Sequence, residues 1–494
     1  MNFFSTRNKQ NKVSPSYAIA HGLAADGGLF VPESFPALTA DEIKGMADSS
    51  YAERSAYVMS KFLTDFSYEE LLSYTQNAYA RFDGDPAPVV KTDDNTFVLE
   101  LWHGPTSAFK DMALTVLPYL ITASKAKLGD EKCSLVLVAT SGDTGKAAME
   151  GFRDVPGTRM IVFYPDGGVS SMQELQMRTQ EGCNIDVVAV KGNFDDCQTA
   201  VKTIFNDESA IAELGAMGYE LSSANSINWG RLVPQIAYYV SAYVDLMDSG
   251  EIEYGAPVNF CVPCGNFGNI LAAYYAKRMG LPVGKLICAS NKNNVLYDFI
   301  NTGVYSTKRD FYKTISPSMD ILVSSNLERL LFELCNRSDE AVSAKMSSLA
   351  TNREYRLDDN EFAALRAEFQ AYWYDDEQTL DAIEETFDET GYLVDTHTAV
   401  AVAAATEAGD DDTPIVVVST ASPYKFTQDV LYALTGQRIS DPFKAAKALE
   451  METAMEIPQQ ISALKSKPIL HSTVTEKAGI YGTVRQILVR GKNG

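Results

Sequence analysis

Short apolar segments rich in β-branched residues alternate with segments of helical spacing along most of this chain. The clearest of them cover residues 135–138, 160–163, 185–190, 258–262 and 415–418. Several are apolar at nearly every position, which is typical of strands covered on both faces. Strands that alternate with helices predict an α/β fold with mostly parallel sheets, in which ligands bind beyond the carboxyl ends of the strands.

The chain divides into an N-terminal segment, a large α/β region and a C-terminal tail. Residues 1–85 are predicted to be mainly helical, because apolar residues recur at helical spacing over 41–81. Glycine, proline and aspartate are dense at 83–88 and mark a boundary. We expect the α/β region, with two subdomains, to cover 86–440, and a helical tail that packs on it to cover 441–494.

The chain is strongly acidic, with a formal net charge of −23 over 494 residues. A surface of this charge repels the phosphates of nucleic acids and of anionic lipids, so neither a nucleic acid nor a membrane is an expected partner. The acidic clusters at 375–377 and 381–389 are predicted to be solvated helix faces. A site for an anion must therefore be built locally from backbone N–H groups and a few basic side chains.

Cysteine usage and the first residues of the chain predict a reducing, cytoplasmic location. Seven cysteines in a chain of this length do not suggest a disulfide framework. The first residues lack the apolar stretch of a secretory signal, and no apolar run is long enough to span a bilayer. Cys261 and Cys264 form a C-x-x-C pair without a second pair at zinc spacing, so no metal site is expected.

The loop after the predicted strand at 135–138 is rich in glycine and hydroxyl groups. It contains Ser141, Gly142, Asp143, Thr144 and Gly145. Such a loop presents backbone N–H groups to an anion. It is too short for the G-x-x-x-x-G-K-[ST] loop of nucleotide triphosphatases, and Ala147 replaces the hydroxyl residue that would hold magnesium. The loop favours an anion site and argues against ATP hydrolysis.

A second loop with closely spaced glycines follows the predicted strand at 258–262. Gly265 and Gly268 flank Asn266 and Phe267 directly before a predicted helix. Glycines let the backbone bend tightly around a phosphate at a helix N-terminus, although a plain strand-to-helix turn also needs glycine. The spacing is not G-x-G-x-x-G, which disfavours a dinucleotide.

Two hydroxyl residues, Ser419 and Thr420, follow the last apolar segment. They would place neutral hydroxyl groups at the ligand-binding edge of the sheet. A helix N-cap is the alternative for such residues.

Lys110 lies between Phe109 and the start of an apolar helical stretch. Partial removal from water at such a position favours the uncharged amine, which is a nucleophile toward aldehydes. A solvated surface position is commoner for an isolated lysine. The combination of this lysine with the anion-binding loops indicates a catalytic site.

Several segments of the chain resemble the threonine synthase family of fold-type II enzymes, which depend on pyridoxal phosphate. The resemblance is carried, in the order of the family, by residues 22–32, 103–111, 141–145, 225–231, 265–269 and 395–399. It extends from near residue 5 to beyond residue 420. Together these matches are highly specific.

The resemblance implies a fold like that of the tryptophan synthase β chain, with two open, twisted, mostly parallel sheets and flanking helices. It implies pyridoxal 5′-phosphate as cofactor and a lyase that converts O-phospho-L-homoserine and water to L-threonine and phosphate, the last step of threonine biosynthesis. It is compatible with either a monomer or a homodimer.

The resemblance also implies roles for individual residues toward the cofactor. Lys110 would bind pyridoxal phosphate covalently and then move protons between substrate carbons. Thr420 would hydrogen-bond the pyridine nitrogen. The cofactor phosphate would be held by Gly265, Asn266, Phe267, Gly268 and Asn269.

A further group of residues is expected to bind the substrate. The loop with Ser141, Gly142, Asp143 and Thr144 would hold its carboxylate. The leaving phosphate would be bound by Arg231 with Asn225, Ser226 and Asn228, and also by Arg7 and His103. The alternatives are that Arg231 caps or pairs on a helix and that Asn225 is a turn residue. Residues 394–397 either support the site from behind or contain a buried structural histidine.

The sequence departs from the family at two positions. Ser422 starts a Ser-Pro-Tyr segment where many relatives have His-Pro-Ala, and Asn8 stands where many have glycine. The first departure puts in doubt any role of a histidine at that position, and neither touches Lys110 or the glycine loop.

Two other functions stay open at this point. The same fold serves serine or threonine dehydration and cysteine synthesis, against which Asp143 and residues 225–231 favour threonine synthase. An inactive relative that only binds phosphorylated ligands is the other alternative, and the presence of Lys110 argues against it.

Overall fold

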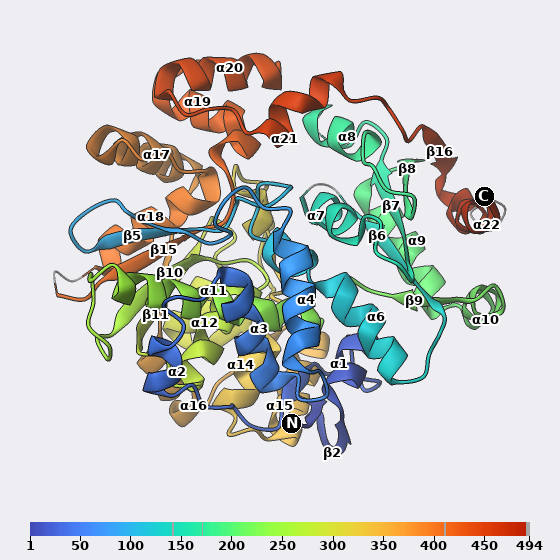
Figure 1. The fold of residues 1–494 in the computed structure, drawn as a ribbon, viewed down its shortest axis with the longest axis horizontal. Coiled ribbons are helices and arrows are strands. Elements are labelled where there is room, and N and C mark those ends of the chain that lie inside the picture. The colour runs from blue at the N-terminus through green and yellow to red at the C-terminus, as the bar shows by residue number, and fades with distance from the viewer. Residues whose placement is uncertain (141–142, 170, 410–411, 491–494) are drawn as a thin grey trace.

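Two separate, mostly parallel sheets organise the protein (Figure 1). The structure is a computed structural model that describes residues 1–140, 143–169, 171–409 and 412–490. The larger, six-stranded sheet has the order β14-β11-β10-β15-β5-β4, and the five-stranded sheet has the order β16-β8-β7-β6-β9. The predicted α/β class with two open sheets and flanking helices is confirmed.

Every apolar segment singled out in the sequence lies in a strand. In the larger sheet the strands are β4 (Val89–Lys91), β5 (Thr96–Glu100), β10 (Val258–Pro263), β11 (Val283–Ser290), β14 (Phe369–Trp373) and β15 (Ile415–Ser419). In the smaller sheet they are β6 (Cys133–Ala139), β7 (Thr158–Pro165), β8 (Ile185–Lys191), β9 (Tyr219–Ser222) and β16 (Thr473–Glu476). Only the β4–β5 pair is antiparallel among the described strands of these two sheets.

The larger sheet is covered on both faces, which explains the continuous apolar character of β10 and β15. Val416 and Val418 face the main core, to which α11 (Trp229–Asp248) and α12 (Gly268–Arg278) contribute. Val417 faces the opposite side and packs with Val400 of α18 (Thr396–Ala408). Side chains that alternate between two buried faces make most positions of these strands apolar. The polar Asn259 of β10 is itself buried, and its Oδ1 accepts from the N–H of Lys285 over 2.7 Å.

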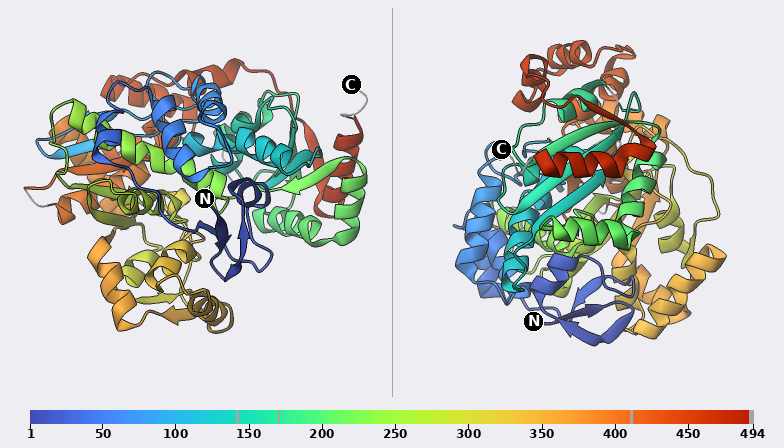
Figure 2. Two further views of the ribbon diagram at one scale, coloured as in Figure 1. Left: turned by 60° about the horizontal axis from the view of Figure 1, so that its bottom comes forward. Right: turned by 90° about the vertical axis from the view of Figure 1, so that its right-hand side faces the viewer.

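The smaller sheet is also sandwiched between helices. The helices α7 (Asp143–Phe152) and α8 (Ser171–Arg178) lie on one side, and α9 (Phe194–Asn206), α10 (Glu208–Ala216) and α22 (Ile480–Arg490) lie on the other (Figure 2). β16 pairs in parallel with β8, so the chain end adds an edge strand to this sheet. Helical spacing predicted only helices for this tail.

The N-terminal segment combines a small sheet with helices. The antiparallel strands β1 (Phe3–Ser5), β2 (Asn8–Val13) and β3 (Phe30–Pro32) were not predicted. The helices are α1 (Pro15–His21), α2 (Ala40–Lys44), α3 (Tyr51–Phe62) and α4 (Tyr68–Tyr79). Ser50 and Ser67 begin α3 and α4 with capping boxes. Phe62 packs edge-on against Trp229, which joins α3 to α11.

The remaining elements complete the layers around the larger sheet. They are α5 (Asp111–Leu114), α6 (Leu117–Lys127), α13 (Val295–Thr302), β12 (Val304–Ser306), α14 (Leu327–Leu334), α15 (Asp339–Asn352), β13 (Glu354–Arg356), α16 (Asp359–Glu368), α17 (Asp376–Thr390), α19 (Thr427–Thr435), α20 (Pro442–Thr453) and α21 (Gln459–Ser462). The acidic segment forms α17, which buries Ile383 and exposes Asp381, Glu384 and Glu385, as predicted for a solvated face. No helix in the described ranges is long and apolar enough to cross a membrane.

Candidate active site

The carboxyl ends of strands from both sheets meet at one cavity of about 920 Å³. The residues that line it include Thr140 after β6, Ser222 at the end of β9, Pro263 at the end of β10 and Thr420 after β15. Lys110 lines the same cavity. Lys110 and residues of the glycine-rich loops after β6 and β10 therefore line the same cavity at the carboxyl ends of the strands, where the sequence predicted the site.

The backbone before Lys110 is fixed to the backbone after β15. The N–H of Phe109 donates to the carbonyl of Thr420 over 2.9 Å, and the N–H of Ser422 donates to the carbonyl of Ser107 over 3.1 Å. Lys110 Nζ donates to Ser318 Oγ over 3.2 Å. The two backbone bonds place the segment that carries Lys110 beside Thr420, although more than 300 positions separate the two segments in the sequence.

A buried carboxyl group shapes the turn that carries Lys110. Asp111 Oδ2 accepts from the N–H of Thr106 over 2.7 Å, and Asp111 Oδ1 accepts from Thr106 Oγ1 over 2.6 Å. Burial raises the pKa of the Asp111 carboxyl to about 6. Gly104 is required beside it, since a Cβ there would lie 2.6 Å from Asp111 Cβ.

The loop from Gly265 to Asn269 is built as an anion cradle. It leads into α12, whose first N–H groups lack helical acceptors. Phe267 has a left-handed φ of 63°, which turns the chain into the helix. A Cβ at Gly265 would lie 2.7 Å from the carbonyl oxygen of Ser318, so the close approach of these two backbones requires glycine.

Asn269 supplies a side-chain donor to this cradle. Its Oδ1 accepts from the hydroxyl of Tyr239 over 2.6 Å and also from the hydroxyl of Tyr238. Its Nδ2 is buried without a hydrogen-bond partner, and Asn269 lines the cavity. A buried donor without a partner is costly, and an anionic group in the cradle would satisfy it. The loop thus fits a phosphate.

Arg231 is a second feature suited to an anion. It lies in the first turn of α11, is only 5% exposed and lines the cavity. Its Nη1 donates to the carbonyl of Ala224 over 2.9 Å, whereas its Nε has no hydrogen-bond partner. Burial lowers the pKa of the guanidinium to about 10. In the described chain no carboxylate pairs with Arg231, which argues against the alternative of a helix ion pair.

The neighbours of Arg231 differ in what they can offer a ligand. Asn225, Ser226 and Asn228 all line the cavity. Asn228 has both ends of its amide engaged, because Nδ2 donates to the carbonyl of Ile19 over 2.9 Å and Oδ1 accepts from the N–H of Gly230 over 2.8 Å. Asn225 is exposed and its Oδ1 accepts from Ser226 Oγ, so it combines a turn role with access to the cavity.

Two predicted phosphate ligands are not among the residues that line the cavity. Arg7 forms a two-point ion pair with Glu328, with Nε–Oε1 and Nη2–Oε2 distances of 2.8 and 2.7 Å. His103 Nε2 lies 2.7 Å from Glu100 Oε2, and its ring stacks on Trp102. Both groups are engaged by protein partners in this structure, and their role as phosphate ligands stays a prediction.

The predicted carboxylate loop is described only in part. Thr144 in α7 lines the cavity. Ser141 and Gly142 lie outside the described residues, and Asp143 is the first residue of α7.

Ser318 was not predicted from the sequence. It lies in the short 3-10 helix η1 (Pro317–Met319) and contacts Lys110. The preceding segment carries no regular periodicity, so no local signal marks this serine. His397, left open between a supporting and a structural role, also lines the cavity. Ser422 is fully buried, caps the turn at Tyr424 and is not among the lining residues.

Comparison with known proteins identifies the family. The families described as threonine synthase N terminus, pyridoxal-phosphate dependent enzyme, and threonine synthase C-terminal match residues 2–79, 86–421 and 398–478. Threonine synthase from Pseudomonas aeruginosa is 38% identical, over 94% of this chain and 97% of that protein. The chain belongs to the threonine synthase family. Pyridoxal phosphate is the cofactor of this enzyme family, and the cradle and Lys110 fit it.

Relatives of this threonine synthase family member include a longer protein. Human threonine synthase-like 1 is 39% identical over 96% of this chain, which spans 65% of the length of that relative. The solved structure of pyridoxal-phosphate-bound threonine synthase from Brucella melitensis superposes with a TM-score of 0.89 at 35% identity and covers 100% of both chains. The yeast threonine synthase structure also has a TM-score of 0.89, at 32% identity over 99% of both chains.

Proposed function

We propose that this protein is a threonine synthase that converts O-phospho-L-homoserine and water to L-threonine and phosphate. The observation that carries the proposal is the buried guanidinium of Arg231, whose Nε has no partner. A buried cation without a counter-charge is costly, so a site of this kind is suited to an anionic ligand. Because the cradle at Gly265 to Asn269 serves the cofactor phosphate, Arg231 provides for a second phosphate in the same cavity.

The proposal assigns roles toward the cofactor to residues that line the cavity. Lys110 would bind pyridoxal phosphate through Nζ, and Thr420 would face its ring nitrogen. The N–H groups that begin α12, together with Asn269 Nδ2, would hold its phosphate. The bound cofactor supplies an electron sink that lets the substrate carbons lose protons.

Roles toward the substrate complete the proposal. Thr144 and its loop would bind the carboxylate through hydroxyl and N–H donors. Arg231, with Ser226 and Asn225, would bind the phosphate and stabilise its charge as it leaves. Lys110 Nζ is the group suited to take protons from the substrate carbons and to return them, and Ser318 Oγ orients it by accepting one of its hydrogens.

The other functions account less well for Arg231. Dehydration of serine or threonine, and cysteine synthesis from a substrate without a phosphate group, do not need a cation for a leaving phosphate. A protein that only binds phosphorylated ligands needs no lysine for covalent attachment of a cofactor, which is the role proposed here for Lys110. Both alternatives nevertheless make distinct experimental predictions.

A substrate panel tests the proposal. Purified enzyme with pyridoxal phosphate is given O-phospho-L-homoserine, L-threonine or L-serine, and phosphate, threonine and oxoacids are measured. We expect threonine and phosphate in equal amounts from the first substrate and no oxoacid from the other two. Oxoacid formation without phosphate release would support a dehydratase and overturn the proposal.

A further inference from the structure

Ser318 lies between Lys110 and the phosphate cradle. Its Oγ accepts from Lys110 Nζ over 3.2 Å. Its carbonyl oxygen lies so close to Gly265 that a Cβ there would approach it to 2.7 Å. A shift of Ser318 would therefore change the surroundings of both the Lys110 amine and the cradle from Gly265 to Asn269.

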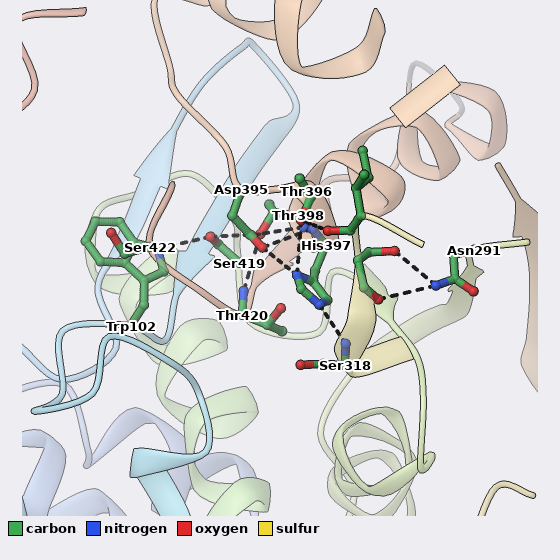
Figure 3. Close-up of polar contacts among 12 residues, drawn as sticks. Trp102, Asn291, Ser318, Asp395, Thr396, His397, Thr398, Ser419, Thr420 and Ser422 are labelled. Atoms are coloured by element: carbon green, nitrogen blue, oxygen red, sulfur yellow. Dashed lines mark hydrogen bonds and ion pairs between the residues drawn. The ribbon is translucent and has the colours of Figure 1, made fainter. Parts of the chain in front are cut away.

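The backbone of Ser318 is held by a histidine from another part of the chain (Figure 3). The N–H of Ser318 donates to His397 Nε2 over 3.1 Å, and His397 Nδ1 lies 2.8 Å from Asp395 Oδ2. Because Nε2 accepts a hydrogen bond, the imidazole carries its proton on Nδ1, and this N–H donates a hydrogen bond to Asp395 Oδ2.

Asp395 and His397 form a rigid pair. Asp395 is fully buried and caps α18, where its Oδ1 accepts from the N–H of Thr398 over 3.0 Å and its Oδ2 accepts from the N–H of His397 over 2.9 Å. The ring of His397 is 3% exposed and packs on Phe426 with a centroid separation of 4.6 Å. The orientation of the imidazole is thus fixed by the start of α18.

A separate polar cluster holds the same loop on both sides of Ser318. Asn291 Nδ2, after β11, donates to Ser316 Oγ over 3.0 Å and to Asp320 Oδ1 over 2.9 Å. The loop is therefore anchored at 316 and 320 by Asn291 and at its centre by His397. Only the central anchor contacts the residue that meets Lys110.

We propose that Asp395 and His397 are positioning residues that set the place of Ser318 and, through it, the place of the Lys110 amine. They do not relay protons to Lys110, because the link at Ser318 is an amide N–H that only donates. Their contribution is to keep His397 Nε2 unprotonated, so that it accepts from the N–H of Ser318. The hydrogen bond from Nδ1–H to Asp395 favours this tautomer. The inference rests on the proposed function only in taking Lys110 as the reactive amine.

The tautomer of His397 gives a test that does not depend on turnover. The chain has four histidines, so ¹⁵N-histidine NMR of the holoenzyme is tractable, and the variant His397→Gln assigns the signal. We expect an Nδ1–H imidazole in the wild type and a larger share of the Nε2–H tautomer in Asp395→Leu, because leucine leaves Nδ1 without the acceptor that Asp395 Oδ2 provides. The same tautomer in both proteins would overturn the proposal.

Hydrogen exchange and kinetics test the effect on Ser318 and Lys110. In the holoenzyme, His397→Ala should raise the exchange rate of the peptide that contains Ser318 by about tenfold or more, the loss of one hydrogen bond. It should lower kcat by about tenfold while KM changes less than twofold, and shift the absorption of the bound cofactor. His397→Gln, which can keep an acceptor near the position of Nε2, should recover most of both losses.

A histidine elsewhere provides the matched control. His471, whose Nε2 lies 2.8 Å from the carbonyl of Gln180, is not among the cavity-lining residues, and His471→Gln should leave exchange at Ser318, absorption and kcat unchanged. Equal losses in His397→Ala and His397→Gln would assign His397 to packing alone and overturn the proposal. Failure of O-phospho-L-homoserine as substrate would instead overturn the proposed function, since the NMR and exchange results stand without it.

Discussion

Lys110 Nζ donates to Ser318 Oγ over 3.2 Å, across 208 positions of sequence. The segment that carries Lys110 is bound to the end of β15, and the loop that carries Ser318 is bound to α18 and to the end of β11. The surroundings of the Lys110 amine are therefore made by elements that are far apart in the chain.

Replacing Arg231 by methionine should raise the KM for O-phospho-L-homoserine by about 10- to 100-fold, the range expected for a lost hydrogen bond to a charged group. The affinity for pyridoxal phosphate should change much less, because the proposal assigns the cofactor phosphate to the loop from Gly265 to Asn269 and not to Arg231. Arg7→Met is the matched control, since Arg7 pairs with Glu328 and is not among the lining residues. An unchanged KM in Arg231→Met, measured by steady-state phosphate release, would remove Arg231 from the phosphate site.

Replacing Asn269 by alanine should raise the Kd for pyridoxal phosphate by about tenfold or more, because a buried donor to a charged phosphate is lost. Fluorescence titration of the cofactor-free protein measures this. Tyr239→Phe should weaken binding to a smaller extent, since it removes one of the hydroxyl groups that fix Asn269. Tyr243→Phe is the control, because its hydroxyl donates instead to the carbonyl of Ala256. Equal affinities in Asn269→Ala and the wild type would contradict the cradle.

Replacing Gly265 by alanine should impair cofactor binding, because the new Cβ would meet the carbonyl oxygen of Ser318 at 2.7 Å. Either the cradle or the Ser318 loop must then move, and a displacement of about 1 Å can cost roughly 100-fold in rate. Gly215→Ala in α10 is the control, since a Cβ there has nothing within 4 Å and alanine favours a helix. The measurements are Kd for pyridoxal phosphate and kcat, and equal values in the two variants would count against the close approach.

The buried carboxyl of Asp111 should make stability depend on pH. Its pKa is raised by burial from 3.8 to about 6 in the folded protein. The stabilisation from the neutral carboxyl is complete below about pH 4 and is lost as pH rises through about 6, a change of about 3 kcal/mol. Asp111→Asn should remove this part of the pH dependence.

Urea unfolding of the wild type and of Asp111→Asn between pH 4.5 and 7.5 measures the effect. The difference in free energy of unfolding between the two proteins should shift in favour of the variant as pH rises. Parallel pH profiles would show that Asp111 is not protonated in the folded protein within this range.

The sequence predicts those parts of the site that depend on local pattern. Strands such as β10 and β15 are visible as apolar runs because both faces of the sheet are covered, and the loops that follow them lie at the cavity because parallel strands share a carboxyl edge. Lys110, Asn269 and Thr420 can be selected in or near those loops from the sequence alone.

The rest depends on tertiary packing that has no local signal. Arg7 lies in a segment that matches the family, yet Glu328 engages its guanidinium from α14. Asn228 lines the cavity, but its amide is used by Ile19 and Gly230. Ser318 comes from an irregular loop whose position is set by His397 and Asn291. The role of each of these side chains depends on which residues contact it in the folded protein, and spacing along the sequence does not reveal those contacts.

The most direct test of the proposed reaction is phosphate release from O-phospho-L-homoserine by the wild type and by Lys110→Ala, with threonine measured in the same samples. We expect one threonine per phosphate in the wild type, and neither product above background in Lys110→Ala refolded and reconstituted in the same way. Wild-type enzyme that releases no phosphate, or Lys110→Ala that retains wild-type turnover, would contradict the proposed reaction and the role of its lysine.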